Sequence, residues 1–183
     1  MNFKVLSVAA LVISSFCFSA GSVAEQMPES PKQKELRIEN SLNGLFTRAM
    51  NTAAIKLDQT QIIEPFAIVQ KIDGTLGVFG LDQNKNQSVN EQHLSIRRLL
   101  RELAYEKQIT AAVQVMYAII EEKGKSQQHG LTFELEHVSG ISLVRFLPVK
   151  EYIDQEDEKN NKWIFALETL STSIKPRTVF SIL

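Results

Sequence analysis

The sequence predicts an α+β protein with an antiparallel sheet of about five strands and two main helices, in the order αββαβββ. Apolar residues recur at helical spacing in two segments, 35–57 and about 88–107. The other apolar runs are joined by turn dipeptides, Asp73-Gly74 and Ser139-Gly140, which are typical of hairpins. Because hairpins join neighbouring antiparallel strands, this alternation predicts an antiparallel sheet with helices over one or both faces.

Both helices are amphipathic and are expected to pack on the core. In the first, over 35–57, one stripe contains Ile38, Leu42, Leu45, Phe46, Ala49, Met50, Ala53 and Leu57. The polar segment 25–34 before it is predicted to be a flexible leader. The second helix should begin at a capping box, in which the Ser88 hydroxyl and the Glu91 carboxylate bind free amides of the first turn.

The remaining apolar runs are expected to form strands. The expected strands are 65–72, 76–82, 109–121, 131–138, 141–147 and 162–171. The third is rich in β-branched and aromatic residues and long enough to be central. The last is ambiguous, because its apolar residues alternate as in a strand and also fit a helical spacing. The order of elements resembles the roadblock/profilin-like topology, an analogy of fold that implies no function.

The first 24 residues have the pattern of a signal peptide, and the protein is expected to be periplasmic or secreted. Lys4 precedes an apolar run, and 22–24 offers a small-x-small cleavage site. Cleavage there leaves 159 residues, with a single α+β domain expected over 35–183. The only cysteine, Cys17, is removed with the signal, so the mature chain has neither disulfides nor thiol chemistry.

The charge balance excludes some classes of partner. Cleavage leaves 19 Lys and Arg against 21 Asp and Glu, a net charge of −2. Such a chain has no electrostatic basis for binding nucleic acid or anionic membranes, and no integral membrane segment is expected after cleavage. Arg97, Arg98 and Arg101 are expected to be solvated and to pair with glutamates near them on their helix.

The segment 131–148 carries the strongest candidate site. Strand alternation places Glu134 and Glu136 on one face and His137 on the other, so Glu136 and His137 cannot act as a dyad. If the turn is centred on Ser139-Gly140, Glu134 lies opposite Arg145 and can pair with it across the ladder. We therefore expect a binding face made of Glu134, Glu136 and Arg145. The alternative is a hydrolase that uses the two carboxylates in catalysis.

Other chemistries are not supported by the sequence, which predicts neither a cofactor nor a metal. His137 should lie on the apolar face of its strand, hydrogen-bonded at the edge of the core. The three histidines lack metal-ligand spacing, and no phosphate-binding glycine loop or nucleophile motif occurs. The segment 82–93 has oxygen-bearing residues at alternate positions, as in an EF-hand, but Gln87 and His93 replace the required Gly and Glu. Weak calcium binding remains an alternative there.

Several motifs occur together in one order along the chain. They are Asp73-Gly74, Arg97 to Leu103, Ala111 to Val115, Leu135-Glu136-His137, Gly140 and Leu147-Pro148. This order resembles a family of small uncharacterised bacterial proteins. That family combines a hairpin with an Asp-Gly turn, a Leu/Arg helix, a long Ala/Val strand and a Leu-Glu-His-x-x-Gly hairpin that ends at an aliphatic-Pro step. The resemblance covers about 35–150 and implies a common fold without an assigned activity.

These observations together predict an exported, non-catalytic binding domain whose partner is another protein. An immunity or inhibitor protein that neutralises a toxin in the periplasm would use the same kind of surface, and it is the first alternative. The hydrolase acting through Glu134 and Glu136 is the second. The oligomeric state is not indicated by any feature of the sequence.

Overall fold

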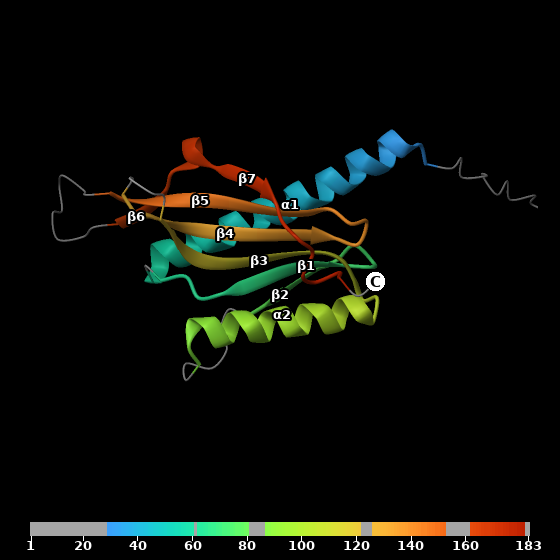
Figure 1. The fold of residues 1–183 in the computed structure, drawn as a ribbon, viewed down its shortest axis with the longest axis horizontal. Helices are drawn as coiled ribbons and strands as arrows, with labels where there is room; N and C mark the ends of the chain where they lie inside the picture. The colour runs from blue at the N-terminus through green and yellow to red at the C-terminus, as the bar shows by residue number, and fades with distance from the viewer. Residues whose placement is uncertain (1–28, 61, 81–86, 122–125, 153–161, 182–183) are drawn as a thin grey trace, which may run out of the picture.

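The structure is a computed structural model, which describes residues 29–60, 62–80, 87–121, 126–152 and 162–181. The predicted signal peptide, the start of the predicted leader and the first part of the EF-hand-like segment lie outside these residues. In the described part, two α-helices and an antiparallel sheet form an α+β fold (Figure 1), as the sequence predicts. Neither of these helices is both long and apolar enough to cross a membrane.

The elements follow the predicted order αββαβββ, with two short strands added at the end. The helices are α1 (Pro31–Thr60) and α2 (Val89–Tyr105). The strands are β1 (Phe66–Lys71), β2 (Leu76–Phe79), β3 (Ile109–Ile120), β4 (Gln128–His137), β5 (Ser142–Tyr152), β6 (Lys162–Phe165) and β7 (Ser171–Ile174). The segment expected to be one strand over 162–171 is instead β6, the 3₁₀ turn Leu167–Thr169 and the start of β7.

Both helix starts are explained by capping. The backbone N–H of Ser30 donates to Gln33 (2.9 Å) and the N–H of Gln33 donates to the Ser30 hydroxyl (3.3 Å), while Pro31 occupies the first helical position. Helix α1 therefore begins four residues earlier than expected, within the predicted leader. The predicted capping box of Ser88 and Glu91 is confirmed at the start of α2.

The sheet has the strand order β2-β1-β3-β4-β5-β6 in the described residues, and β7 also pairs with β5. Strand β5 has 11 residues, so its outer edge accommodates two short strands. Residues Leu143–Phe146 pair with β7, and Val149–Tyr152 pair with β6. The sheet thus has seven strands where about five were expected.

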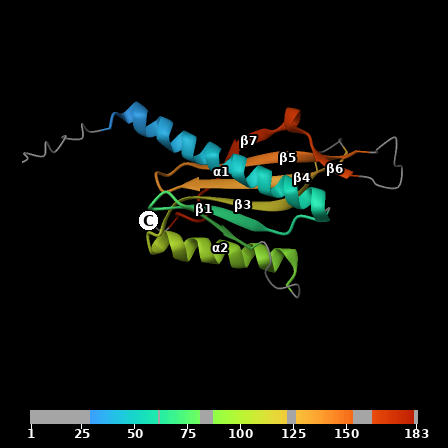
Figure 2. The same ribbon diagram turned by 180° about the vertical axis from the view of Figure 1, so that it is seen from behind.

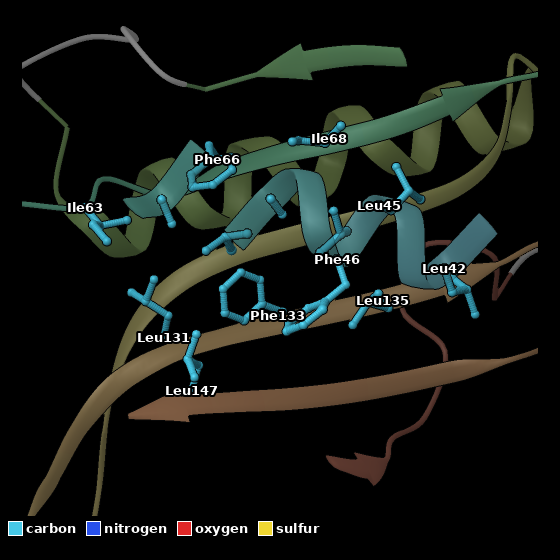
Figure 3. Close-up of a cluster of buried hydrophobic side chains, with 14 of the residues drawn as sticks. Leu42, Leu45, Phe46, Ile63, Phe66, Ile68, Leu131, Phe133, Leu135 and Leu147 are labelled. Atoms are coloured by element: carbon cyan, nitrogen blue, oxygen red, sulfur yellow. The ribbon is translucent and has the colours of Figure 1, made fainter. Parts of the chain in front are cut away.

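Helix α1 covers one face of the sheet, and α2 together with the C-terminal end of the chain covers part of the other (Figures 1 and 2). On the α1 side, the Phe46 and Phe133 rings meet edge to face, with centroids 5.0 Å apart. Figure 3 shows the side chains of this layer: Leu42, Leu45, Phe46, Ile63, Phe66, Ile68, Leu131, Phe133, Leu135 and Leu147. The α2 side is a smaller cluster formed by Ala67, Val69, Ile96, Leu100, Ala104, Ile109, Ala112, Val179 and Phe180.

The β4–β5 hairpin is where the expected register is wrong. Its loop has three residues, because the His137 N–H donates to the Ile141 carbonyl and the Gly140 N–H donates to the His137 carbonyl. Gly140 adopts a φ of 106°, a conformation that favours glycine. Compared with a two-residue turn, this loop shifts the pairing by one residue, so Arg145 lies opposite Phe133. A shift of one residue moves a side chain to the other face of the sheet.

Candidate functional site

Glu136 is the most deeply buried charged residue among those described, with 1% of its surface exposed. Its carboxylate accepts hydrogen bonds from the backbone N–H groups of Thr178 (2.7 Å), Val179 (2.8 Å) and Phe180 (3.2 Å). The Thr178 hydroxyl (2.7 Å) and the Lys175 ammonium (2.8 Å) also donate to it. Burial by itself would raise the pKa of Glu136, but these donors outweigh it and lower the pKa to about 2. The group is therefore a structural anion near neutral pH.

Glu134 lies beside it and is held by two cations from different parts of the chain. The Arg97 guanidinium of α2 donates to it at 2.7 Å, and Lys175 donates at 2.8 Å. Lys175 therefore bridges Glu134 and Glu136, and all three side chains are largely buried. The expectation that Arg97 is solvated and paired within its own helix is wrong.

Arg145 lies on the opposite face of the sheet, under α1. Its guanidinium donates to the Asn43 side-chain oxygen at 2.8 Å and lies 4.5 Å from the centre of the Phe46 ring. The expected pair of Glu134 and Arg145 is therefore wrong, because the hairpin register separates them. Glu134, Glu136 and Arg145 do not share a face, so they do not make up one binding surface.

The segment that completes this cluster is the C-terminal strap, residues Lys175–Phe180. It leaves β7 and crosses the face of the sheet towards α2 (Figure 1). Its Val179 and Phe180 are buried in the α2 cluster. The sequence reasoning missed this segment. Two adjacent apolar residues near the end of the chain are a cue that the end is buried, but no local pattern connects them with Glu136, 43 positions away.

His137 occupies the position expected for it, on the α1 face at the edge of the core. The ring is buried, and its Nδ1 accepts from the Ser139 N–H (3.0 Å) and lies 2.8 Å from the Ser139 hydroxyl. Burial lowers the pKa of His137, and the charges of Arg37 and Lys34 lower it further. Because Nδ1 accepts a hydrogen bond, the neutral ring carries its proton on Nε2.

His137 also lines the basic cleft, an open cavity of about 620 Å³. The cleft lies where the first turns of α1 pass the β1–β2 and β4–β5 turns, at the right-hand end of Figure 1. Residues of α1, of β1, β3 and β4 and of the two turns line it. Its polar lining includes Lys34, Arg37, Ser41, Gln70, Asp73 and His137. Unlike the Glu136 cluster, the cleft is accessible from outside and can receive a ligand.

A second cavity, the apolar hollow, adjoins the basic cleft and has a volume of about 480 Å³. Ile72, Thr110 and Val138 line both cavities, and Ala104, Lys107 and Ile109 complete the hollow. Ile72 is 73% exposed and Val138 is 43% exposed. This end of the sheet therefore combines exposed aliphatic side chains with a neighbouring basic cavity.

The described residues contain no group of three or more His, Cys, Asp or Glu side chains that could hold a metal ion. The first part of the EF-hand-like segment lies outside the described residues. His93, at its end, belongs to α2 and lies on the buried face of that helix. The burial of His93 lowers its pKa, and the Arg97 charge lowers it further.

Comparisons of the chain with models of protein families, with curated proteins and with solved structures gave no match. The resemblance to a family of small bacterial proteins and the roadblock/profilin-like analogy therefore stay predictions.

Proposed function

We propose that this chain is an exported, non-catalytic protein-interaction domain, which binds its partner through the end of the sheet that carries the basic cleft and the apolar hollow. The observation that carries the proposal is the exposure of Ile72 and Val138 between these two cavities. Exposed aliphatic side chains with a polar rim are typical of protein-binding surfaces. Export is supported by the pattern of residues 1–24.

The arrangement of Glu134 and Glu136 gives no support to the alternative of a hydrolase. A general acid must carry a proton near the working pH, and the pKa of Glu136 is about 2. Both carboxylates already have cationic partners, and Glu136 is almost fully buried. The two residues instead join the C-terminal strap to the sheet. A toxin remains one kind of partner for the exposed end, in which case the domain is an immunity or inhibitor protein.

Photo-crosslinking in cells tests the proposal. A photoreactive phenylalanine analogue is placed at Ile72 or Val138, and at Leu167 as a control. Leu167 is 57% exposed and lies in the 3₁₀ turn at the other end of the sheet (Figure 1). We expect discrete cross-linked species of higher mass from positions 72 and 138, with none from 167. The absence of adducts at both test positions, or the same adducts at Leu167, would contradict the proposed binding surface.

A further inference from the structure

We propose that the basic cleft receives the carboxylate of an acidic side chain, presented by a partner segment in which an acidic residue lies next to an aliphatic one. The inference depends on the proposed function and specifies the chemistry of the partner. In this arrangement, the carboxylate enters the basic cleft and the neighbouring aliphatic side chain enters the apolar hollow. Thr110, Ile72 and Val138 line both cavities, so adjacent residues of one segment can fill the two.

The cleft contains more cationic than anionic side chains. Lys34, Arg37 and Lys71 line it, and Asp73 is the one acidic residue of the lining. The Asp73 carboxylate already accepts from the Thr75 N–H (2.9 Å) and the Thr75 hydroxyl (2.6 Å). Among the described residues, no ion pair involves Lys34 or Lys71, although the charge of Lys71 also acts on the Asp73 carboxylate. The cleft therefore has an excess of positive charge, and its two ammonium groups form no ion pair that an incoming anion would have to displace.

The cleft also offers a neutral hydrogen-bond donor, from His137. His137 accepts at Nδ1, so the Nε2–H of the neutral ring is a donor not used in its bonds with Ser139. The charged groups that act on this ring, Arg37 and Lys34, are both positive and disfavour a second proton on it. A carboxylate in the cleft would therefore meet neutral and cationic donors. Acidification would add positive charge at His137 and strengthen the binding of the anion.

The two adjoining cavities favour a carboxylate on a peptide over a free phosphate. Arginine binds phosphate through two parallel N–H donors, but Arg37 uses Nε and Nη2 to bind Glu29, at 3.0 and 3.2 Å. The ammonium groups of Lys34 and Lys71 act as point charges, which bind a carboxylate as well as a phosphate. The adjoining apolar hollow then requires an aliphatic neighbour, which a peptide segment supplies and a free anion does not.

The test uses short peptides as probes, with the protein as purified from exporting cells. One peptide alternates Leu and Glu, and its matched control alternates Leu and Gln, with both ends of each blocked. Binding is followed by the backbone amide signals of the nitrogen-15-labelled protein. We expect the Leu/Glu peptide to shift the signals of Ile72, Gly74 and Ser139, and the Leu/Gln peptide to bind about tenfold more weakly because it lacks the charge. Equal affinity for both peptides would overturn the inference, as would shifts confined to another part of the domain.

Charge-reversal variants complete the test. The double variant Lys34→Glu, Lys71→Glu should lose the preference for the Leu/Glu peptide while keeping the dispersed amide spectrum of a folded protein. Arg48→Glu is the matched control, because Arg48 is exposed on α1 and does not line the cleft. An unchanged preference in the double variant would overturn the inference. If cross-links form at Ile72 but the protein binds the Leu/Glu and Leu/Gln peptides equally well, the carboxylate inference fails. The proposed protein-binding function is then still supported.

Discussion

A single carboxylate, that of Glu136, joins the C-terminal strap to the sheet. It accepts hydrogen bonds from three consecutive backbone N–H groups and from two side chains of the strap. A buried charge is stable only where its hydrogen bonds and charge are compensated, and removing one partner leaves the others unpaired. From the sequence, Glu136 was a candidate for binding or catalysis, because its partners in the strap are about 40 positions away in the chain.

Replacing Glu136 with Gln should destabilise the protein by about 3 kcal/mol, because the buried Lys175 ammonium loses a carboxylate and the amide cannot accept all the N–H groups. Urea unfolding followed by circular dichroism measures the change. The matched control is Glu168→Gln, since Glu168 forms an exposed pair with Lys150 and should give no measurable change. Equal stability of the Glu136→Gln variant and the original protein would show that the strap is held by its apolar residues alone.

The stability of the fold should decrease in acid in two stages. His93 and His137 have lowered pKa values, so the stability they contribute is present above pH 6.5 and decreases as the pH falls below it. The pKa of Glu136 is lowered from 4.5 to about 2, so its contribution is present above pH 4.5 and is lost between 4.5 and 2. Loss of the Glu136 contribution in this second stage should lower the free energy of unfolding by about 3 kcal/mol. Unfolding measured between pH 7 and pH 2 should show both stages. The second stage should be clearly smaller in Glu136→Gln, where only carboxylates such as Asp73 and Glu91, whose pKa values are also lowered, still contribute.

Periodicity and capping predicted the elements of this protein better than their register. The stripe of α1 and the capping box of α2 depend on residues within a few positions of each other, and both are present in the structure. The register of the β4–β5 hairpin depended on the number of loop residues. Ser139-Gly140 is compatible with a two-residue turn. In the structure the loop has three residues, Val138, Ser139 and Gly140, and Gly140 has a positive φ. That single position decided which face Arg145 occupies.

Helix α1 contains one glycine in its interior, Gly44, and this position should tolerate a methyl group. A Cβ atom added there would meet nothing within 4 Å. Gly44→Ala should therefore raise the free energy of unfolding by about 0.5–1 kcal/mol, because glycine loses more backbone entropy in a helix.

The matched control is Gly130→Ala in β4. A Cβ atom at Gly130 would lie 2.5 Å from a ring atom of Phe146 and 2.6 Å from the Leu147 carbonyl oxygen. This variant should be clearly destabilised, and both changes are measured by thermal unfolding. A decrease in stability for Gly44→Ala would mean that the exposed face of α1 has another contact in the folded protein.

At the scale of the whole molecule, the sheet is enclosed by segments from both ends of the sequence. Helix α1 covers one face, while α2 and the C-terminal strap cover part of the other (Figures 1 and 2). The end of the sheet with the basic cleft remains exposed. The carboxylates of Glu134 and Glu136 are therefore inside the molecule, whereas the cationic side chains that line the cleft are at its surface.

A chain that ends after Ile174 should not fold stably. Truncation removes Lys175, whose charge compensates that of Glu136, and the backbone N–H groups that donate to Glu136. It also removes Val179 and Phe180, so the α2 cluster becomes exposed to solvent. The expected result is loss of the cooperative unfolding transition and of amide dispersion. Removal of residues 182–183 alone, which leaves the strap intact, is the control. A cooperative transition in the longer truncation would show that the strap is dispensable.

The sequence by itself determined the α+β class, the two amphipathic helices, the capping box, the hairpins and the opposite orientations of Glu136 and His137. Each of these follows from the spacing of residues that are near one another in the chain. The tertiary structure alone decided that Arg97 and Lys175 neutralise Glu134, that the strap encloses Glu136, and that Arg145 lies under α1. Those contacts join residues 37 to 102 positions apart, which no local pattern in the sequence connects. The basic cleft has the same origin, because its lining comes from four separate elements, α1, β1, β3 and β4, and from the turns that follow β1 and β4.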